Sequence, residues 1–138
     1  MPKVNRERGA AAVEMALLLP VLLLVVVGII EFGYAFFIQG SVANAARVGV
    51  RDYTINYANT KLFTTDTLAQ QASKDKAKDA VFPNPQDIKT RTFSQPCTPN
   101  ASTTFTITYQ YRSLTGLLDG ILGTNVIVTG NARMQCGG

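Results

Sequence analysis

The chain has 138 residues, a formal net charge of +4, two cysteines and no histidine. Its Lys and Arg residues are scattered and form no basic stripe with aromatic partners, which argues against nucleic-acid binding. Without histidine no Ser–His or Cys–His dyad can form, the thiols lack a CxxC spacing, and paired-carboxylate and phosphate-loop motifs are missing, so we expect no enzyme, metal or cofactor site.

An apolar segment begins at Ala10 and runs to Ile30, and further apolar side chains follow as far as Ile38. About 20 apolar residues in a helix are enough to cross a hydrocarbon core of about 30 Å. Alanines beyond Ile38 keep the sequence compatible with a helix. We therefore expect one long helix over residues 10–56, with a transmembrane part at about residues 10–38 and its upper third outside the membrane.

The tip that precedes this segment carries three basic side chains, Lys3, Arg6 and Arg8. Positive charge favours the cytoplasmic side of a membrane, although Arg47 and Arg51 on the far side reduce the asymmetry. We expect a single-pass protein with a cytoplasmic N-terminus and an extracytoplasmic C-terminal domain.

Five residues stand out inside the predicted helix. Glu14 interrupts the apolar run, although a carboxylate inside a membrane costs roughly 2.5–3.5 kcal/mol. Pro20 is expected to kink the helix without ending it. Gly28 and Gly33 offer the small surfaces that membrane helices use for packing. Glu31 is expected near the outer interface, or facing a neighbouring subunit in an assembly.

Residues 8–51 form an ordered series that resembles the TadE-like family of pseudopilins from tight-adherence (Flp, type IVb) pilus systems. The series runs through an Arg-Gly pair, a glutamate, an apolar stretch that ends in proline, a second glutamate followed by glycine, and an Ala-Ala-Arg group with a later arginine. In this sequence the matching residues are Arg8, Gly9, Glu14, Ala16 to Pro20, Ile30, Glu31, Gly33, Ala45, Ala46, Arg47 and Arg51.

The resemblance implies a prepilin leader over residues 1–9. A prepilin peptidase would cut after Gly9 on the cytoplasmic side, so that Ala10 becomes the mature N-terminus. Glycine suits this position because it lets the backbone extend into a protease cleft. Glu14 then becomes the fifth mature residue, where its carboxylate can pair with the new amine of an adjacent subunit in a low-dielectric environment.

The resemblance also implies a function, which is that of a minor pilin or pseudopilin in a Tad-type pilus. Such a protein would prime, cap or support the filament in adhesion, and would reside in the bacterial inner membrane or in the pilus at the cell surface. Its partners would be the prepilin peptidase, the major pilin and other minor pilins, the inner-membrane assembly platform, and membrane lipid before assembly.

The exported part, residues 57–138, is predicted to be a small α+β domain. A helix is expected to start at Thr64 or Thr65 and to end before Pro83, because the sequence offers a capping hydroxyl, an early Asp66 and then proline. Its thin apolar stripe of Leu68, Ala72 and Ala80 predicts a helix lying exposed against a sheet.

Two segments alternate apolar and polar residues as half-buried strands do, residues 103–111 and residues 125–134, and residues 89–95 are compatible with an edge strand. The segment between the first two, residues 113–123, is apolar and rich in glycine. Its apolar residues are predicted to line the core, the alternative being a patch that docks on a partner pilin: Leu114, Leu117, Leu118, Ile121 and Leu122.

If the two alternating strands pair antiparallel, the start of the first lies beside the end of the second. Cys97 precedes the first strand and Cys136 follows the second, so the hairpin brings the thiols together. The predicted fold is therefore α+β: a long N-terminal helix, a short helix, and a small antiparallel sheet stapled by one disulfide. A disulfide also fits an oxidising, extracytoplasmic location.

Two other functions remain open from the sequence. The Ala43-Asn44-Ala45 triplet follows a polar stretch and resembles a signal-peptidase site, which would release a secreted binding protein. The apolar region is much longer than the usual signal core, which argues against this alternative. The second is a permanently anchored envelope protein without a pilus role.

Overall fold

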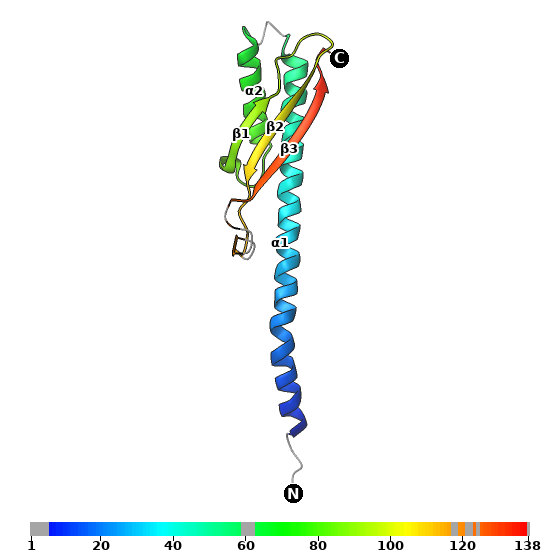
Figure 1. The fold of residues 1–138 in the computed structure, drawn as a ribbon, viewed down its shortest axis with the longest axis vertical. Coiled ribbons are helices and arrows are strands. Elements are labelled where there is room, and N and C mark those ends of the chain that lie inside the picture. The colour runs from blue at the N-terminus through cyan, green and yellow to red at the C-terminus, as the bar shows by residue number, and fades with distance from the viewer. Residues whose placement is uncertain (1–5, 59–62, 117–118, 121–122, 124, 138) are drawn as a thin grey trace.

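The computed structural model describes residues 6–58, 63–116, 119–120, 123 and 125–137. Figure 1 shows a long helix, α1 (Arg6–Asn56), whose lower half projects from a small module built around its upper half. The module adds helix α2, a short 3-10 turn η1 and three strands: α2 (Asp66–Asp79), η1 (Pro85–Asp87), β1 (Ile88–Phe93), β2 (Ser102–Gln110) and β3 (Ile127–Gln135). The predicted α+β fold, with a long helix, a second helix and a small disulfide-linked sheet, is confirmed.

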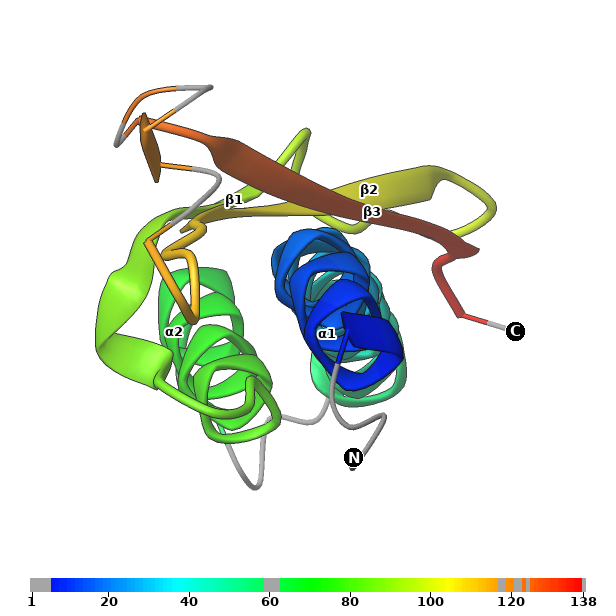
Figure 2. The ribbon, with the colours of Figure 1, turned by 90° about the horizontal axis from the view of Figure 1, so that it is seen from below.

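The module has two layers. The antiparallel sheet has the order β1-β2-β3, and Figure 2 shows α1 and α2 side by side on one face of it. In the central strand, Phe105 lies opposite Phe93 of β1 and Ala132 of β3. Every second residue of β2 is buried, as the alternation in the sequence predicts.

The core lies between the sheet and one face of α1. The upper half of α1 contributes five buried apolar residues to it. These residues contact α2, the inward side chains of the sheet, and Tyr111, which directly follows β2. These core residues are Ile38, Val42, Ala45, Ala46 and Val50 from α1, Ala77 and Val81 from the α2 region, and Phe105, Ile107, Tyr109 and Tyr111. The upper half of α1 is therefore part of the module and not a stalk beneath it.

Two glycines allow close approach between these layers. A Cβ atom on Gly49 would lie 2.5 Å from Cε1 of Phe105, and one on Gly130 would lie 2.6 Å from the carbonyl oxygen of Val42. Both distances are shorter than van der Waals contact, so any larger side chain would push α1 away from the sheet.

Helix α2 begins at the predicted cap, since the Thr65 side chain accepts a hydrogen bond from the Leu68 amide. Its buried face differs from the prediction. The buried residues are Ala69, Ser73 and Ala77, whereas Leu68 is 51% exposed. The prediction was wrong for Leu68, whereas Ala72 and Ala80 are half-buried. Helix α2 packs mainly on α1 and only slightly on β1, so that small residues face the neighbouring helix.

A polar contact accompanies this helix pairing. The Ser73 hydroxyl donates a hydrogen bond to Oδ2 of Asp52, at 2.9 Å, and Lys76 forms a salt bridge with Oδ1 of the same carboxylate. Both partners lie one turn apart on α2, and Asp52 lies on α1. The contact therefore fixes the register between the two helices.

Candidate membrane-anchoring and assembly helix

The lower half of α1 is apolar and bare. Among the described residues, α1 is the one helix long and apolar enough to cross a membrane, and the most apolar part of it buries nothing. Large apolar side chains are exposed all around this stretch: Val13, Met15, Leu17, Leu18, Leu19, Val21, Leu22, Leu23, Leu24, Val25, Val26, Ile29 and Ile30. A helix that is apolar on every side needs lipid or other helices around it.

The predicted leader junction lies at the lower end of α1. Gly9, Ala10 and Glu14 all belong to the helix and are exposed. We call residues 9–30 of α1 the bare shaft. A Cβ atom on Gly9 would meet nothing within 4 Å. The carboxylate of Glu14 therefore projects from the bare shaft, one turn above Ala10, where a second subunit could reach it. Cleavage after Gly9 and pairing by Glu14 remain predictions.

The helix is continuous through Pro20. Gly28 and Gly33 lie further up the same helix, and a Cβ atom on either would meet nothing within 4 Å. Their small surfaces thus make no close contact with the other described parts of the chain. They are open to another helix, which is what small residues at membrane-helix interfaces provide.

Glu31 has a different environment from Glu14. It is fully buried, and both carboxylate oxygens accept hydrogen bonds from the segment after β2. Oε1 accepts from the Tyr111 hydroxyl and the Leu114 amide, each at 2.9 Å. Oε2 accepts from the amide and the hydroxyl of Thr115, at 3.0 and 2.8 Å. The side chain expected at an interface or facing a neighbour is instead bound within its own chain.

Sequence reasoning missed this role of Glu31. The segment after β2 was interpreted from its apolar residues. The prediction that Leu114 lines the core was wrong, because its side chain is exposed, and residues 117–118 and 121–122 lie outside the described residues. The hydroxyls of Tyr111 and Thr115 in that segment were the available signal. Since a buried carboxylate requires several donors, hydroxyl groups next to a backbone turn are suitable partners.

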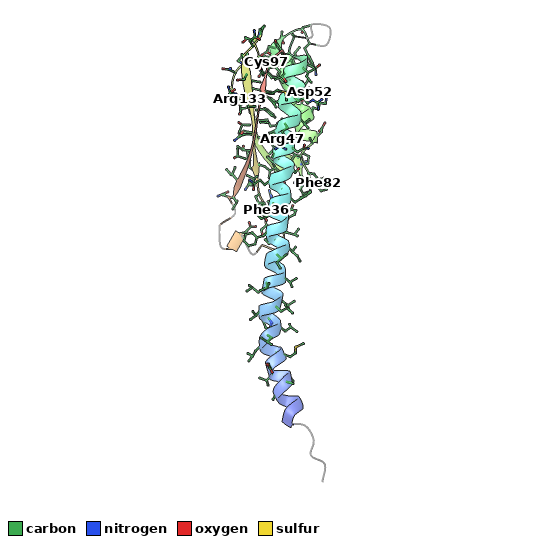
Figure 3. All side chains as sticks on the ribbon, turned by 90° about the vertical axis from the view of Figure 1, so that its right-hand side faces the viewer. Phe36, Arg47, Asp52, Phe82, Cys97 and Arg133 are labelled. Carbon is green, nitrogen blue, oxygen red and sulfur yellow. A yellow bond between two sulfur atoms is a disulfide. The ribbon has the colours of Figure 1, made fainter. Side chains whose placement is uncertain are left out.

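The disulfide joins Cys97 to Cys136, as predicted, with 5.6 Å between their Cα atoms. It connects the loop before β2 to the end of β3, at the upper end of the module, where Figure 3 labels Cys97. The hairpin register explains the pairing, because Ser102 lies opposite Gln135, next to Cys136. The predicted geometry of this pair is confirmed.

Tyr53 ties α1 to the same end of the module. Its hydroxyl donates to Oδ1 of Asp66 at 2.5 Å and accepts from the Cys97 amide at 2.9 Å. Burial, together with the hydrogen bond to Asp66, raises the pKa of Tyr53. Three elements, α1, α2 and the disulfide loop, thus meet at one buried phenol.

In the described parts of the chain, no three His, Cys, Asp or Glu side chains gather as metal ligands do. The comparison with known families decides what the N-terminal segment is. Residues 9–51 match the family model described as TadE-like protein. This segment is TadE-like.

The resemblance predicted from the sequence is confirmed for this segment. The TadE-like match covers about a third of the chain, and it includes α1 from Gly9 through most of its upper half. No curated protein and no solved structure matches the chain. The match falls on the helix that is long and apolar enough to cross a membrane.

Proposed function

We propose that this protein is a minor pilin or pseudopilin of a Tad-type pilus, anchored in the bacterial inner membrane by the lower half of α1. One observation carries the proposal: a single TadE-like helix is bare and apolar below Glu31 and forms the core of a module above it. Such a helix can leave the lipid only if other apolar helices replace it. Packing among N-terminal helices in a filament satisfies this requirement.

In this proposal a prepilin peptidase removes residues 1–9 and exposes the amine of Ala10. Glu14 then pairs with that amine on an adjacent subunit, and the pair sets the axial register as subunits leave the membrane. Gly28 and Gly33 allow close contact with the major pilin or other minor pilins, and the assembly platform of the inner membrane acts on the same helix. The module faces the outside and primes, caps or supports the filament.

The packing of α1 argues against release by a signal peptidase. Cleavage after Ala45 would remove Glu31, Ile38 and Val42, which are all buried in the module. The sheet would lose part of its cover, and the donors of Tyr111 and Thr115 would lose their acceptor. The proposal therefore favours a chain in which the anchor and the module stay joined.

The test is incorporation into pili. In a strain that makes Tad pili, the protein is expected in the fraction sheared from the cells as well as in the inner membrane. Glu14→Ala is expected to leave the protein in the membrane and to remove it from the sheared fraction, and Glu14→Asp is expected to restore part of the incorporation because it keeps the charge.

Two results would count against the proposal. If deletion of the protein leaves pilus number unchanged and none is found in sheared pili, the plain envelope anchor is the better reading. If the Glu14→Ala protein is incorporated as well as the unchanged protein, the pairing role of Glu14 is wrong.

A further inference from the structure

Large apolar side chains form a rim at the lower end of the module. Phe36 and Phe37 come from α1, Phe82 from the turn after α2, and Leu114 from the segment after β2; we call these four the lower rim. Phe36 is 71% exposed, Phe82 61% and Leu114 58%. The rings of Phe37 and Phe82 meet edge to face, with 5.8 Å between centroids. Figure 3 shows Phe36 and Phe82 toward the lower end of the module.

The length of the charge-free stretch places the membrane surface near this rim. The run between Glu14 and Glu31 has about 16 residues and a length of about 24 Å at 1.5 Å per residue. A hydrocarbon core of about 30 Å therefore extends past it, and the headgroup layer adds roughly 5–7 Å on each side. Phe36 and Phe37 lie one to two turns above Ile30, which is the level of the outer headgroup layer.

The other two rim residues are held to α1 by separate hydrogen bonds. The Phe82 amide donates to the Ser41 hydroxyl at 2.8 Å, and the Phe82 ring lies against Phe37. Because Leu114 and Thr115 donate their amides to the Glu31 carboxylate, the segment after β2 is held beside the helix just above the bare shaft. The Leu114 side chain stays exposed there. The buried carboxylate thus gains four donors at a depth where few water molecules are available, and the apolar side chain is left facing outward.

We propose that the lower rim seats the module on the outer leaflet of the bilayer, with Phe36, Phe37, Phe82 and Leu114 in the headgroup layer. The inference rests on the proposed membrane anchoring. A lipid surface is favoured over a second copy because the rim is continuous with the span and gathers side chains from three elements around the part of α1 that directly follows the bare stretch.

The chain has no tryptophan, so a single introduced tryptophan reports its own surroundings. The full-length chain is placed in phosphatidylcholine vesicles whose acyl chains are brominated either close to the headgroup or deep in the core. The reporters are Phe82→Trp and Leu114→Trp at the rim. Ile55→Trp is the matched control, because Ile55 is equally exposed on α1 but lies at the upper end of the module. Leu22→Trp reports the anchor itself.

We expect shallow bromine to remove most of the emission of Phe82→Trp and Leu114→Trp and to leave Ile55→Trp unchanged. Deep bromine should quench Leu22→Trp. If Leu22→Trp is quenched but both rim reporters behave like Ile55→Trp, the seating inference is overturned and the anchor stands. Rim reporters that are shielded from bromine only at high protein concentration would indicate a second copy and would also overturn it. If deep bromine does not quench Leu22→Trp, the proposed membrane anchoring is contradicted instead.

Discussion

The two halves of α1 have similar secondary structure and opposite surroundings. Below Glu31 the helix exposes apolar side chains on every side, and above it one face is buried under the module while the other stays open. The apolar face of the upper half is covered by other parts of the same chain, whereas the lower half requires lipid or other helices around it. One continuous helix therefore links a membrane-adapted segment to a folded module, with no flexible linker between them.

The two glutamates of α1 show the same difference on the scale of one side chain. Glu14 is exposed on the bare shaft, and Glu31 is buried with four donors from residues 111–115. Both interrupt an apolar helix, yet only Glu31 has its need for donors met inside the chain. A substitution at Glu31 should act on folding, and a substitution at Glu14 should act on assembly.

Loss of the disulfide should produce the largest difference between the two halves. The two cysteines are separated by 39 positions in the sequence, so the bond closes a long loop. Cys97→Ser combined with Cys136→Ser is expected to lower the free energy of unfolding of the module by about 3–4 kcal/mol, because the unfolded chain regains loop entropy. Thermal unfolding in detergent, followed by circular dichroism, measures the change. An unchanged unfolding midpoint would contradict this expected loss of stability. The helical signal of the bare shaft should survive the unfolding of the module.

Exchange of each glutamate for glutamine should give the next largest difference in stability. Glu31→Gln removes a charged acceptor and aims an amide group at the donors of Leu114 and Thr115, so a loss of about 1.5–3 kcal/mol is expected. The matched Glu14→Gln should leave the stability of the module unchanged. Equal midpoints for the two variants in the same detergent would mean that the contacts of Glu31 add nothing to the module.

The smallest contrast compares two glycines of α1. Gly40→Ala meets open space and should raise stability by about 0.5–1 kcal/mol through helix propensity. Gly49→Ala places its methyl group against Phe105 and Ala77, where overpacking of about 1–3 kcal/mol outweighs that gain. The two variants should therefore shift the unfolding midpoint in opposite directions, and shifts of the same sign would show that the helix can move off the sheet at little cost.

Features encoded by local pattern were predictable from the sequence. The long apolar run, the alternation in β2, the Thr65 cap and the hairpin that pairs Cys97 with Cys136 all follow from residues close to one another or from one strand pairing. The register of α2 and the partners of Glu31 depend on contacts between distant segments. Composition and periodicity carry no information on which small residue meets a neighbouring helix, or on which loop supplies donors to a carboxylate.

We propose that one anchored helix, trimmed only at its leader, joins the membrane or the filament to the module. Mass spectrometry of the N-terminus of the protein isolated from a membrane with an active prepilin peptidase tests it most directly. We expect a chain that begins at Ala10 and contains the intact disulfide. A start near Ala46 would contradict it, since the core residues Ile38 and Val42 would be lost, and an intact Met1 would mean that no leader is removed.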